Sequence, residues 1–281
     1  MSVAFVLSGG ASLGSIQVGM LQALTANRIR PELIIGTSAG AINGAWLASG
    51  DTEADLARLA DIWRGLNRND VFPVNPFTGV LGLAAWGNHL VSDRGLRRLL
   101  RKHLRFERLQ DAPIPLHVVA TDVLTGVDVQ LSEGNAIDAI MASAAVPGIF
   151  PPVRIGGGLL MDGGVVETTP IGHAVGPGAT TVWVLPPGVA CAIEKVPESA
   201  LATALHAIML AIGQRISFDI ERYETRVDLK VVPPLCPLAI SPADFSYGAE
   251  LIDRARAQTE QWFAQGMPTE RQSQLLKVQS H

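Results

Sequence analysis

Short apolar runs alternate with segments of helical periodicity along most of this chain. The runs are rich in β-branched residues and occur at residues 3–7, 33–35, 116–120, 182–185 and 229–232. Helical patterns lie at residues 14–26, 38–47, 52–66 and 244–263. Strands buried on both faces of a sheet give such continuous runs, and parallel strands need crossover connections, which are usually helical. The sequence therefore predicts an α/β fold with a mostly parallel central sheet and helices on both faces.

The length of 281 residues suits one large α/β domain. We expect this domain to cover residues 1–268, with Asp51 as the N-cap of its third helix, and the polar tail at 269–281 to be disordered. The segment 70–90 differs, because prolines and glycines are scattered among its apolar side chains without steady periodicity. It is either an irregular cap over a binding cleft or a connection packed on the domain.

Charge and hydropathy narrow the possible partners. The formal net charge is -4, and no continuous run of lysine or arginine would follow a phosphate backbone or an anionic membrane. We therefore expect no nucleic-acid partner. The first residues lack a basic leader, and the apolar stretches at 80–86 and 200–212 are shorter than a membrane-spanning helix. The sequence predicts a soluble, cytoplasmic protein in which Cys191 and Cys236 are buried thiols.

The strongest chemical signal is the sequence Gly36-Thr37-Ser38-Ala39-Gly40. This GxSxG follows an expected strand directly and precedes an expected helix, which is the context of a nucleophile elbow. Glycines there let the backbone pass close to its neighbours, while the serine hydroxyl stays exposed at a helix N-terminus. Ser38 is thus the predicted nucleophile, with Gly36 and Gly40 supporting the turn.

A second glycine-rich loop, SGGASLG from Ser8 to Gly14, also joins a strand to a helix. Backbone N–H groups at a helix start lack intrahelical partners and can hold a developing negative charge. A dinucleotide loop is the rival interpretation, but Ala11 replaces its central glycine and no acidic residue ends the second strand. The lysine and serine or threonine of a phosphate loop are also missing. We therefore expect an oxyanion hole and no cofactor.

The serine needs a base, and the sequence offers histidines and carboxylates as candidates. The six histidines, none of which lies in a motif, are His89, His103, His117, His173, His206 and His281. Asp162 lies before Gly163 and Gly164 in a turn after an apolar segment, where burial would raise its basicity. Asp122 is the competing carboxylate, although 121–126 also has the composition of a hairpin turn. The residues alone leave this choice open.

The three motifs, in this order, resemble those of the patatin-like phospholipases. Three segments carry the resemblance, namely LSGGASLGSIQVGML at 7–21, ASAAVPGIFPPV at 142–153 and MDGGVVETTPI at 161–171. The resemblance implies a three-layer α/β/α sandwich that hydrolyses lipid acyl esters without metal or cofactor. It also implies Ser38 as nucleophile, Asp162 as proton acceptor, and the amides of Gly9, Gly10 and Ala11 as oxyanion donors.

The glycine-rich loop departs from the family pattern at two positions. Ala11 stands where a third glycine is usual, and Leu13 stands where a basic residue is usual. Leu13 cannot attract an anionic phosphate, so we expect neutral acyl esters or weakly held lysolipids as substrates in preference to anionic phospholipids. Transient contact with a membrane is a further expectation. An acyltransferase and an inactive member that binds lipid or a partner protein remain alternatives. The sequence does not indicate an oligomeric state.

Overall fold

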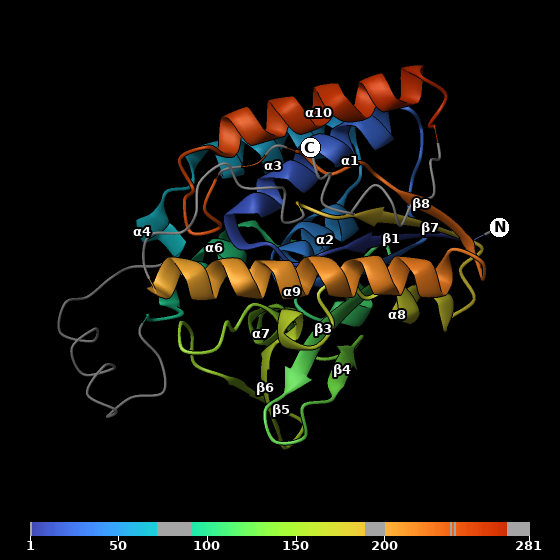
Figure 1. Ribbon diagram of the computed structural model, residues 1–281. Helices are drawn as coiled ribbons and strands as arrows, with labels where there is room; N and C mark the ends of the chain where they lie inside the picture. The colour runs from blue at the N-terminus through green and yellow to red at the C-terminus, as the bar shows by residue number, and fades with distance from the viewer. Residues whose placement is uncertain (1, 72–90, 189–199, 237, 239, 269–281) are drawn as a thin grey trace.

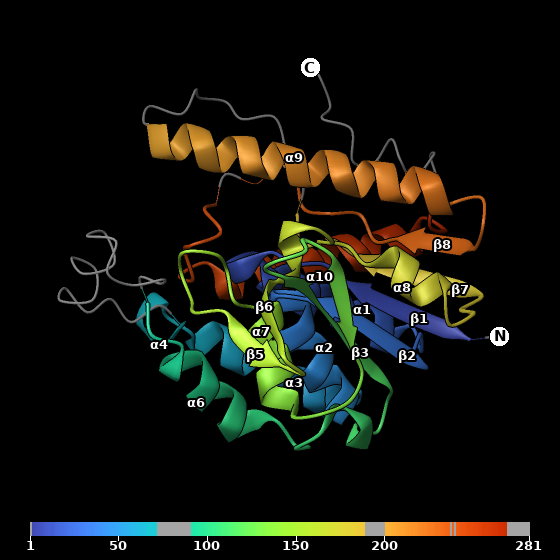
Figure 2. The same cartoon turned by 90° about the horizontal axis from the view of Figure 1, so that it is seen from below.

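The computed structural model describes residues 2–71, 91–188, 200–236, 238 and 240–268 (Figure 1). A single sheet runs through the molecule, with helices covering both of its faces (Figures 1 and 2). Its strands are β1 (Val3–Leu7), β2 (Leu33–Thr37), β3 (Leu116–Asp122), β4 (Asp128–Leu131), β5 (Val153–Ile155), β6 (Gly158–Asp162), β7 (Thr181–Leu185) and β8 (Asp228–Val231). The hydrogen-bonded path is β5-β6-β3-β2-β1-β7-β8, and β4 pairs with β3.

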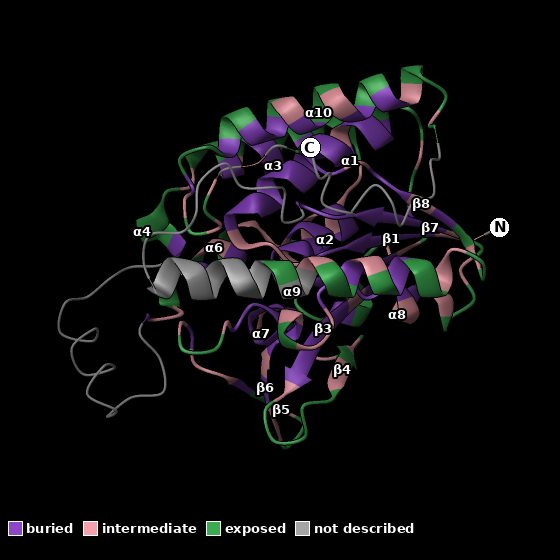
Figure 3. Ribbon diagram, viewed as in Figure 1, coloured by how far each residue is buried: buried purple, intermediate pink, exposed green. Residues whose placement is uncertain are grey.

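The strand β1 shows why the sheet needs cover on both sides. Phe5 and Leu7 point into one core, and Ala4 and Val6 point into the other. Side chains alternate between the two faces of a strand, so a run of five apolar residues can only be buried between two layers. Figure 3 shows the buried strands between the helical layers. The three-layer α/β/α arrangement expected from the sequence is confirmed.

Two sets of helices form the outer layers. The larger core packs against α1 (Gly14–Ala26), α2 (Ala39–Ser49), α3 (Glu53–Gly65), α6 (Arg94–His103), α7 (Ala136–Ser143) and α10 (Gly248–Ala264). The opposite face is covered by α8 (Ile171–Val175) and by the C-terminal part of α9 (Ala200–Tyr223). The short helix α4 (Arg68–Val71) lies beside α6.

The parallel strands β2, β1, β7 and β8 extend from β3, as the sequence predicted. The antiparallel strands β4, β5 and β6 at the other end were not predicted. Two helix starts also differ. Thr52, not Asp51, caps α3, because its side chain and that of Asp55 each accept a hydrogen bond from the other's backbone N–H. The last helix begins at Gly248, not at residue 244.

The register on β3 brings two distant segments together. Val118 and Val119 pair with both β2 and β4, so these two strands lie on opposite edges of β3. Ala120 and Thr121 pair with both β4 and β6, which puts β6 on the same edge as β2. Thr37 pairs with Val119, and Asp162 pairs with Ala120, the next residue. The C-terminal ends of β2 and β6 therefore meet end to end.

Several expectations fall outside the described residues. These are most of the possible cap at 70–90, the tail at 269–281 and Cys191. Cys236 is exposed and disulfide-bonded, so the prediction of a buried thiol is wrong for this residue. The apolar stretch 200–212 belongs to the helix α9. Among the described helices, none combines the length and the apolar character needed to cross a bilayer.

Candidate active site

Ser38 occupies the sharp turn between β2 and α2. Its backbone is in an unusual conformation with φ 54° and ψ -120°, in the positive-φ range that side chains rarely adopt. The turn is tight because glycines flank it. A Cβ on Gly40 would lie 2.1 Å from the Leu7 carbonyl oxygen, and one on Gly36 would lie 2.5 Å from the Gly40 carbonyl oxygen. The elbow thus holds the Ser38 hydroxyl at the N-terminus of α2, whose dipole favours negative charge there.

The Ser38 hydroxyl donates a hydrogen bond to Asp162, with 2.7 Å between Oγ and Oδ2. The second carboxylate oxygen of Asp162 accepts a hydrogen bond from the Gly164 N–H at 2.7 Å. Gly163, between them, lies so close to β3 that a Cβ would be 2.3 Å from the Val119 carbonyl oxygen. Gly163 and Gly164 therefore let the Asp162 side chain reach Ser38, while the Gly164 N–H holds the other carboxylate oxygen in place.

Burial shapes the chemistry of Asp162. The residue is only 6% exposed, and this desolvation raises the pKa of its carboxyl to about 6. The hydrogen bonds from Ser38 and Gly164 oppose the increase by stabilising the charged form. A carboxylate of raised pKa is a stronger base than an ordinary aspartate and is still mostly ionised at neutral pH. The pair can therefore transfer a proton from the serine.

Ser143, at the end of α7, supports the elbow and was not identified from the sequence. Its hydroxyl accepts a hydrogen bond from the Ser38 N–H at 2.8 Å and donates one to the Val119 carbonyl at 2.6 Å. It thus ties Ser38 to β3, the strand that also pairs with Asp162. The segment 142–153, which contains Ser143, already resembled a family segment, and this was the available signal.

The glycine-rich loop lies beside the serine, and its N–H groups are not equivalent. A Cβ on Gly9 would lie 3.3 Å from the Ser38 Cβ, but the Gly9 N–H donates to the Thr168 carbonyl at 3.0 Å. Of the three predicted oxyanion donors, Gly9 thus has its N–H bonded to another acceptor in this structure. In the described part of the chain, the N–H groups of Gly10 and Ala11 have no acceptor.

The two departures from the family loop have different structural consequences. Ala11 has φ 49°, a left-handed conformation in which a Cβ costs roughly 1–2 kcal/mol. The loop keeps the shape that glycine would favour, at the expense of some strain. Leu13 is 2% exposed and packs in the larger core. A Cβ on Gly14, the next residue, would lie 2.9 Å from that of Ala39, so α1 approaches the elbow closely.

A buried polar network holds the loop from below. The Gln17 amide donates to the carbonyls of Ser8 and Leu185, and its oxygen accepts from Asn43. Asn43 in turn accepts from the Trp63 indole at 2.8 Å. Buried polar groups need hydrogen-bond partners, and these side chains supply them to one another and to the backbone. The resulting network links α1, α2 and α3 to the ends of β1 and β7.

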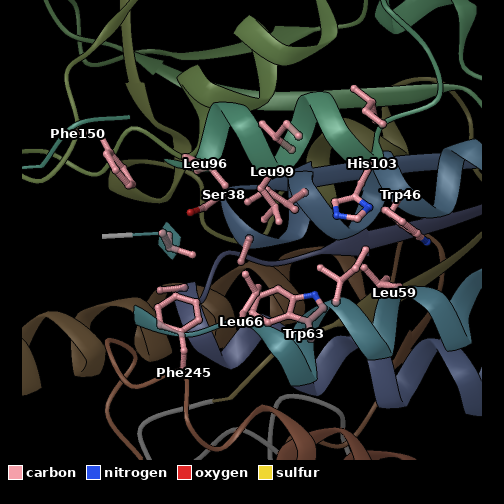
Figure 4. Close-up of a pocket in the computed structure, with 18 of the residues that line it drawn as sticks. Ser38, Trp46, Leu59, Trp63, Leu66, Leu96, Leu99, His103, Phe150 and Phe245 are labelled. Atoms are coloured by element: carbon pink, nitrogen blue, oxygen red, sulfur yellow. The ribbon is translucent and has the colours of Figure 1, made fainter. Parts of the chain in front are cut away.

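An apolar pocket extends from Ser38 between α2, α3 and α6 (Figure 4). Its lining residues are Ala11, Ser38, Ala39, Ile42, Trp46, Leu59, Ile62, Trp63, Leu66, Val71, Leu96, Leu99, Leu100, His103, Leu104, Ala144, Val146, Phe150 and Phe245. None of these described residues is Lys, Arg, Asp or Glu. Figure 4 shows Phe150 and Phe245 near the serine end, and His103 and Trp46 at the far end. Such a lining suits an aliphatic chain.

Known proteins resemble this chain in sequence and in fold. A model of the patatin-like phospholipase family matches residues 5–175. The chain belongs to the patatin-like phospholipase family. The NTE family protein Mb1092c of Mycobacterium bovis is 31% identical over 178 residues, which cover 63% of this chain and 46% of that protein. Lysophospholipase NTE1 of Candida glabrata is 26% identical over 195 residues, which cover 66% of this chain and 10% of that protein.

The patatin-like fold is also seen in a solved structure. VipD from Legionella pneumophila aligns with a TM-score of 0.51 and 16% identity, over 94% of this chain and 67% of that one. This likeness concerns the fold alone. The chain spans less than half the length of each of the two relatives named above.

The other base candidates of this patatin-like chain lie elsewhere. His173 contacts Asp128 and Gln130, each at 2.7 Å, and the Gln130 amide also contacts His117. These residues join α8 to β4 and β3, away from the serine. His103 is in the pocket, where burial and the Lys102 charge lower its pKa. His89, His281 and the His206 side chain lie outside the described residues.

Asp122 closes a turn, as its sequence context also allowed. Its carboxylate accepts hydrogen bonds from the N–H groups of Leu124 and Thr125, at 3.1 and 2.8 Å. Bonds from Thr125 lower the pKa of this carboxyl, the opposite of the change at Asp162. An acid of lowered pKa is a weaker base, so the turn interpretation of Asp122 is supported by both geometry and charge.

Proposed function

We propose that this chain is a serine hydrolase of lipid acyl esters, with Ser38 as nucleophile and Asp162 as its base. The observation that carries the proposal is the 2.7 Å hydrogen bond from the Ser38 hydroxyl to Asp162, next to a long apolar pocket. Family membership supports the same activity, and one relative is named a lysophospholipase.

The reaction begins when Asp162 accepts the Ser38 proton as the oxygen attacks the ester carbonyl. The tetrahedral oxyanion that forms is held by the N–H groups of Gly10 and Ala11, each worth about 3 kcal/mol of barrier. Asp162 then returns the proton to the departing alcohol. A water molecule, deprotonated by Asp162, releases the fatty acid and restores the serine. The acyl chain lies along the pocket throughout, which aligns the carbonyl with Ser38.

A fluorophosphonate probe tests the nucleophile directly. We expect it to label the wild-type protein, and Ser38→Ala to abolish both labelling and hydrolysis of p-nitrophenyl butyrate. Asp162→Asn should lower hydrolysis at least a hundredfold, whereas Asp122→Asn is the matched control and should retain it. Equal losses in the two aspartate variants would contradict the assignment. Folded wild-type protein that resists the probe would instead support a binding protein.

We also propose that the head group is not recognised by a cation in the pocket. Leu13 is buried in the core, and the described lining of the pocket contains neither lysine nor arginine. Hydrolysis of a short-chain monoacylglycerol should therefore match or exceed that of lysophosphatidylglycerol of equal chain length, both supplied below their micellar concentrations. A strong preference for the anionic monomer would contradict this. Products in which the acyl group moves to an added alcohol rather than to water would indicate an acyltransferase.

A further inference from the structure

The helix α6, RGLRRLLRKH, gathers positive charge that is dispersed in the sequence. Glycine and leucines interrupt the basic residues, which is why no continuous basic run was apparent. A helix returns residues three and four positions apart to the same face. Arg97 faces inward and pairs with Asp93 and Asp138, each at 2.6 Å. The other four lysine and arginine residues of α6 lie in a different environment.

Arg94, Arg98, Arg101 and Lys102 are all exposed. Their spacing of four, seven and eight residues from Arg94 puts them on one side of α6. Within the part of the chain that the structure describes, none of the four forms an ion pair. The opposite side of α6 is apolar and buried through Leu96 and Leu100. We call the four exposed residues the basic face of α6.

A hollow beside this basic face adjoins the apolar pocket that extends from Ser38. It is lined by Arg94, Arg98 and Lys102 of α6 together with residues of α3 and α4. Four residues line both the hollow and the pocket, namely Ile62, Leu66, Leu99 and His103. Figure 4 shows Leu66 and Leu99 facing each other across the pocket, with His103 beyond them. The basic hollow and the pocket that leads to Ser38 therefore share part of their lining.

Carboxylates are also present in the hollow, and their partners are known. Asp61 is paired with Arg64 at 3.4 Å, and Asp70 accepts hydrogen bonds from Asn67. Neither acid forms an ion pair with the basic face among the described residues, and the three cations that line the hollow outnumber its two acids. The basic face is a local excess of positive charge on a molecule whose formal net charge is -4.

We propose that the basic face of α6 docks the protein on an anionic phospholipid bilayer, so that a lipid chain enters the pocket between α3 and α6. Each lysine or arginine near an anionic surface strengthens binding by about 1 kcal/mol, or about fivefold. The apolar residues shared by hollow and pocket distinguish a bilayer from a nucleic acid, which offers charge but no aliphatic chain. The lipid entry, though not the docking itself, rests on the proposed hydrolase function.

Vesicle sedimentation tests the docking. We expect wild-type protein to bind phosphatidylcholine vesicles weakly and vesicles with added phosphatidylglycerol much more tightly, with the difference lost at 0.5 M NaCl. Arg98→Gln with Lys102→Gln should weaken binding to the anionic vesicles about 25-fold. The matched control is the double variant Arg222→Gln with Arg226→Gln. It removes the same two positive charges near the C-terminal end of α9, at the other end of the molecule from α6 (Figure 1). It should bind as wild type does.

Hydrolysis of p-nitrophenyl butyrate separates this inference from the proposed function. Both double variants should hydrolyse this soluble ester at the wild-type rate, which also shows that they are folded. Vesicle binding without any ester hydrolysis would leave the docking in place and refute the hydrolase. Normal hydrolysis with equal binding to neutral and anionic vesicles would refute the docking, and so would equal losses in the two double variants.

Discussion

Asp162 is a carboxylate held where its own charge is costly. Burial raises its pKa to about 6, and hydrogen bonds from the Ser38 hydroxyl and the Gly164 N–H offset part of this increase. A fully solvated aspartate would be ionised over a wider pH range but would be a weaker base. The residue is thus poorly placed for stability and well placed for accepting a proton.

This raised pKa predicts the acid limb of the pH profile. Since only ionised Asp162 can accept the Ser38 proton, kcat/KM should fall about tenfold per pH unit below about 6 and level off above it. Measuring kcat/KM for p-nitrophenyl butyrate hydrolysis between pH 4.5 and 8 tests this pH dependence. A limb centred near 4 would show that Asp162 is not the group that titrates.

The same pKa predicts that Asp162→Asn stabilises the protein. The folded state keeps a proton on Asp162 up to about pH 6, but the unfolded state releases it near 3.8, so ionisation destabilises the native state as pH rises through this window. At pH 7.5 the variant should be more stable by about 3 kcal/mol. Urea unfolding at pH 7.5 and pH 4 measures the difference, which should shrink at the lower pH.

Ser143 predicts a different outcome, because its hydroxyl is a structural bridge. Ser143→Ala leaves the Ser38 N–H and the Val119 carbonyl without their partner, at a cost of about 1–3 kcal/mol in unfolding free energy. We expect kcat to fall roughly tenfold as the elbow loses its fixed position. Ser217→Ala is the control, since among the described residues that hydroxyl bonds to the Gly213 carbonyl of its own helix. Equal effects would exclude a specific role for Ser143.

At the scale of elements, the site depends on how closely β6 packs onto β3. Thr37 of β2 and Asp162 of β6 pair with consecutive residues of β3, so the Ser38–Asp162 contact follows from strand register. The turn after β6 is equally close to β3, since Gly163 leaves no room for a side chain beside Val119.

Gly163→Ala tests this dependence. The added Cβ would lie 2.3 Å from the Val119 carbonyl oxygen, so β6 must shift. We expect a loss of about 2–3 kcal/mol in stability and, in the folded protein, roughly a hundredfold loss of kcat/KM. Gly65→Ala is the matched control, because a Cβ there meets nothing within 4 Å. Thermal unfolding and ester hydrolysis are the measurements, and retained activity in Gly163→Ala would contradict the register argument.

At the scale of the whole molecule, the sequence patterns predicted the strands and helices whose residues are apolar on both faces. The bounds of β1 and α1 match their predicted ranges because both elements are almost entirely buried. The hairpin β5–β6 alternates buried and partly exposed residues over a few positions, and its strands are held mainly by pairing with β3. Ser143 was missed because its role exists only once distant segments fold together. The basic face of α6 was missed because glycine and leucines interrupt its charges in the sequence, and only the helix brings them to one side.

The order of the strands along the chain also affects when the protein can become reactive during synthesis. Ser38 and its turn are complete early, but Asp162 is translated 124 residues later and reaches the serine only after β6 has docked on β3. On the assignment proposed above, a ribosome-bound chain shorter than this contains the proposed nucleophile but not the proposed base. We therefore expect chains that end before β6 to lack the ester hydrolysis proposed for the folded protein.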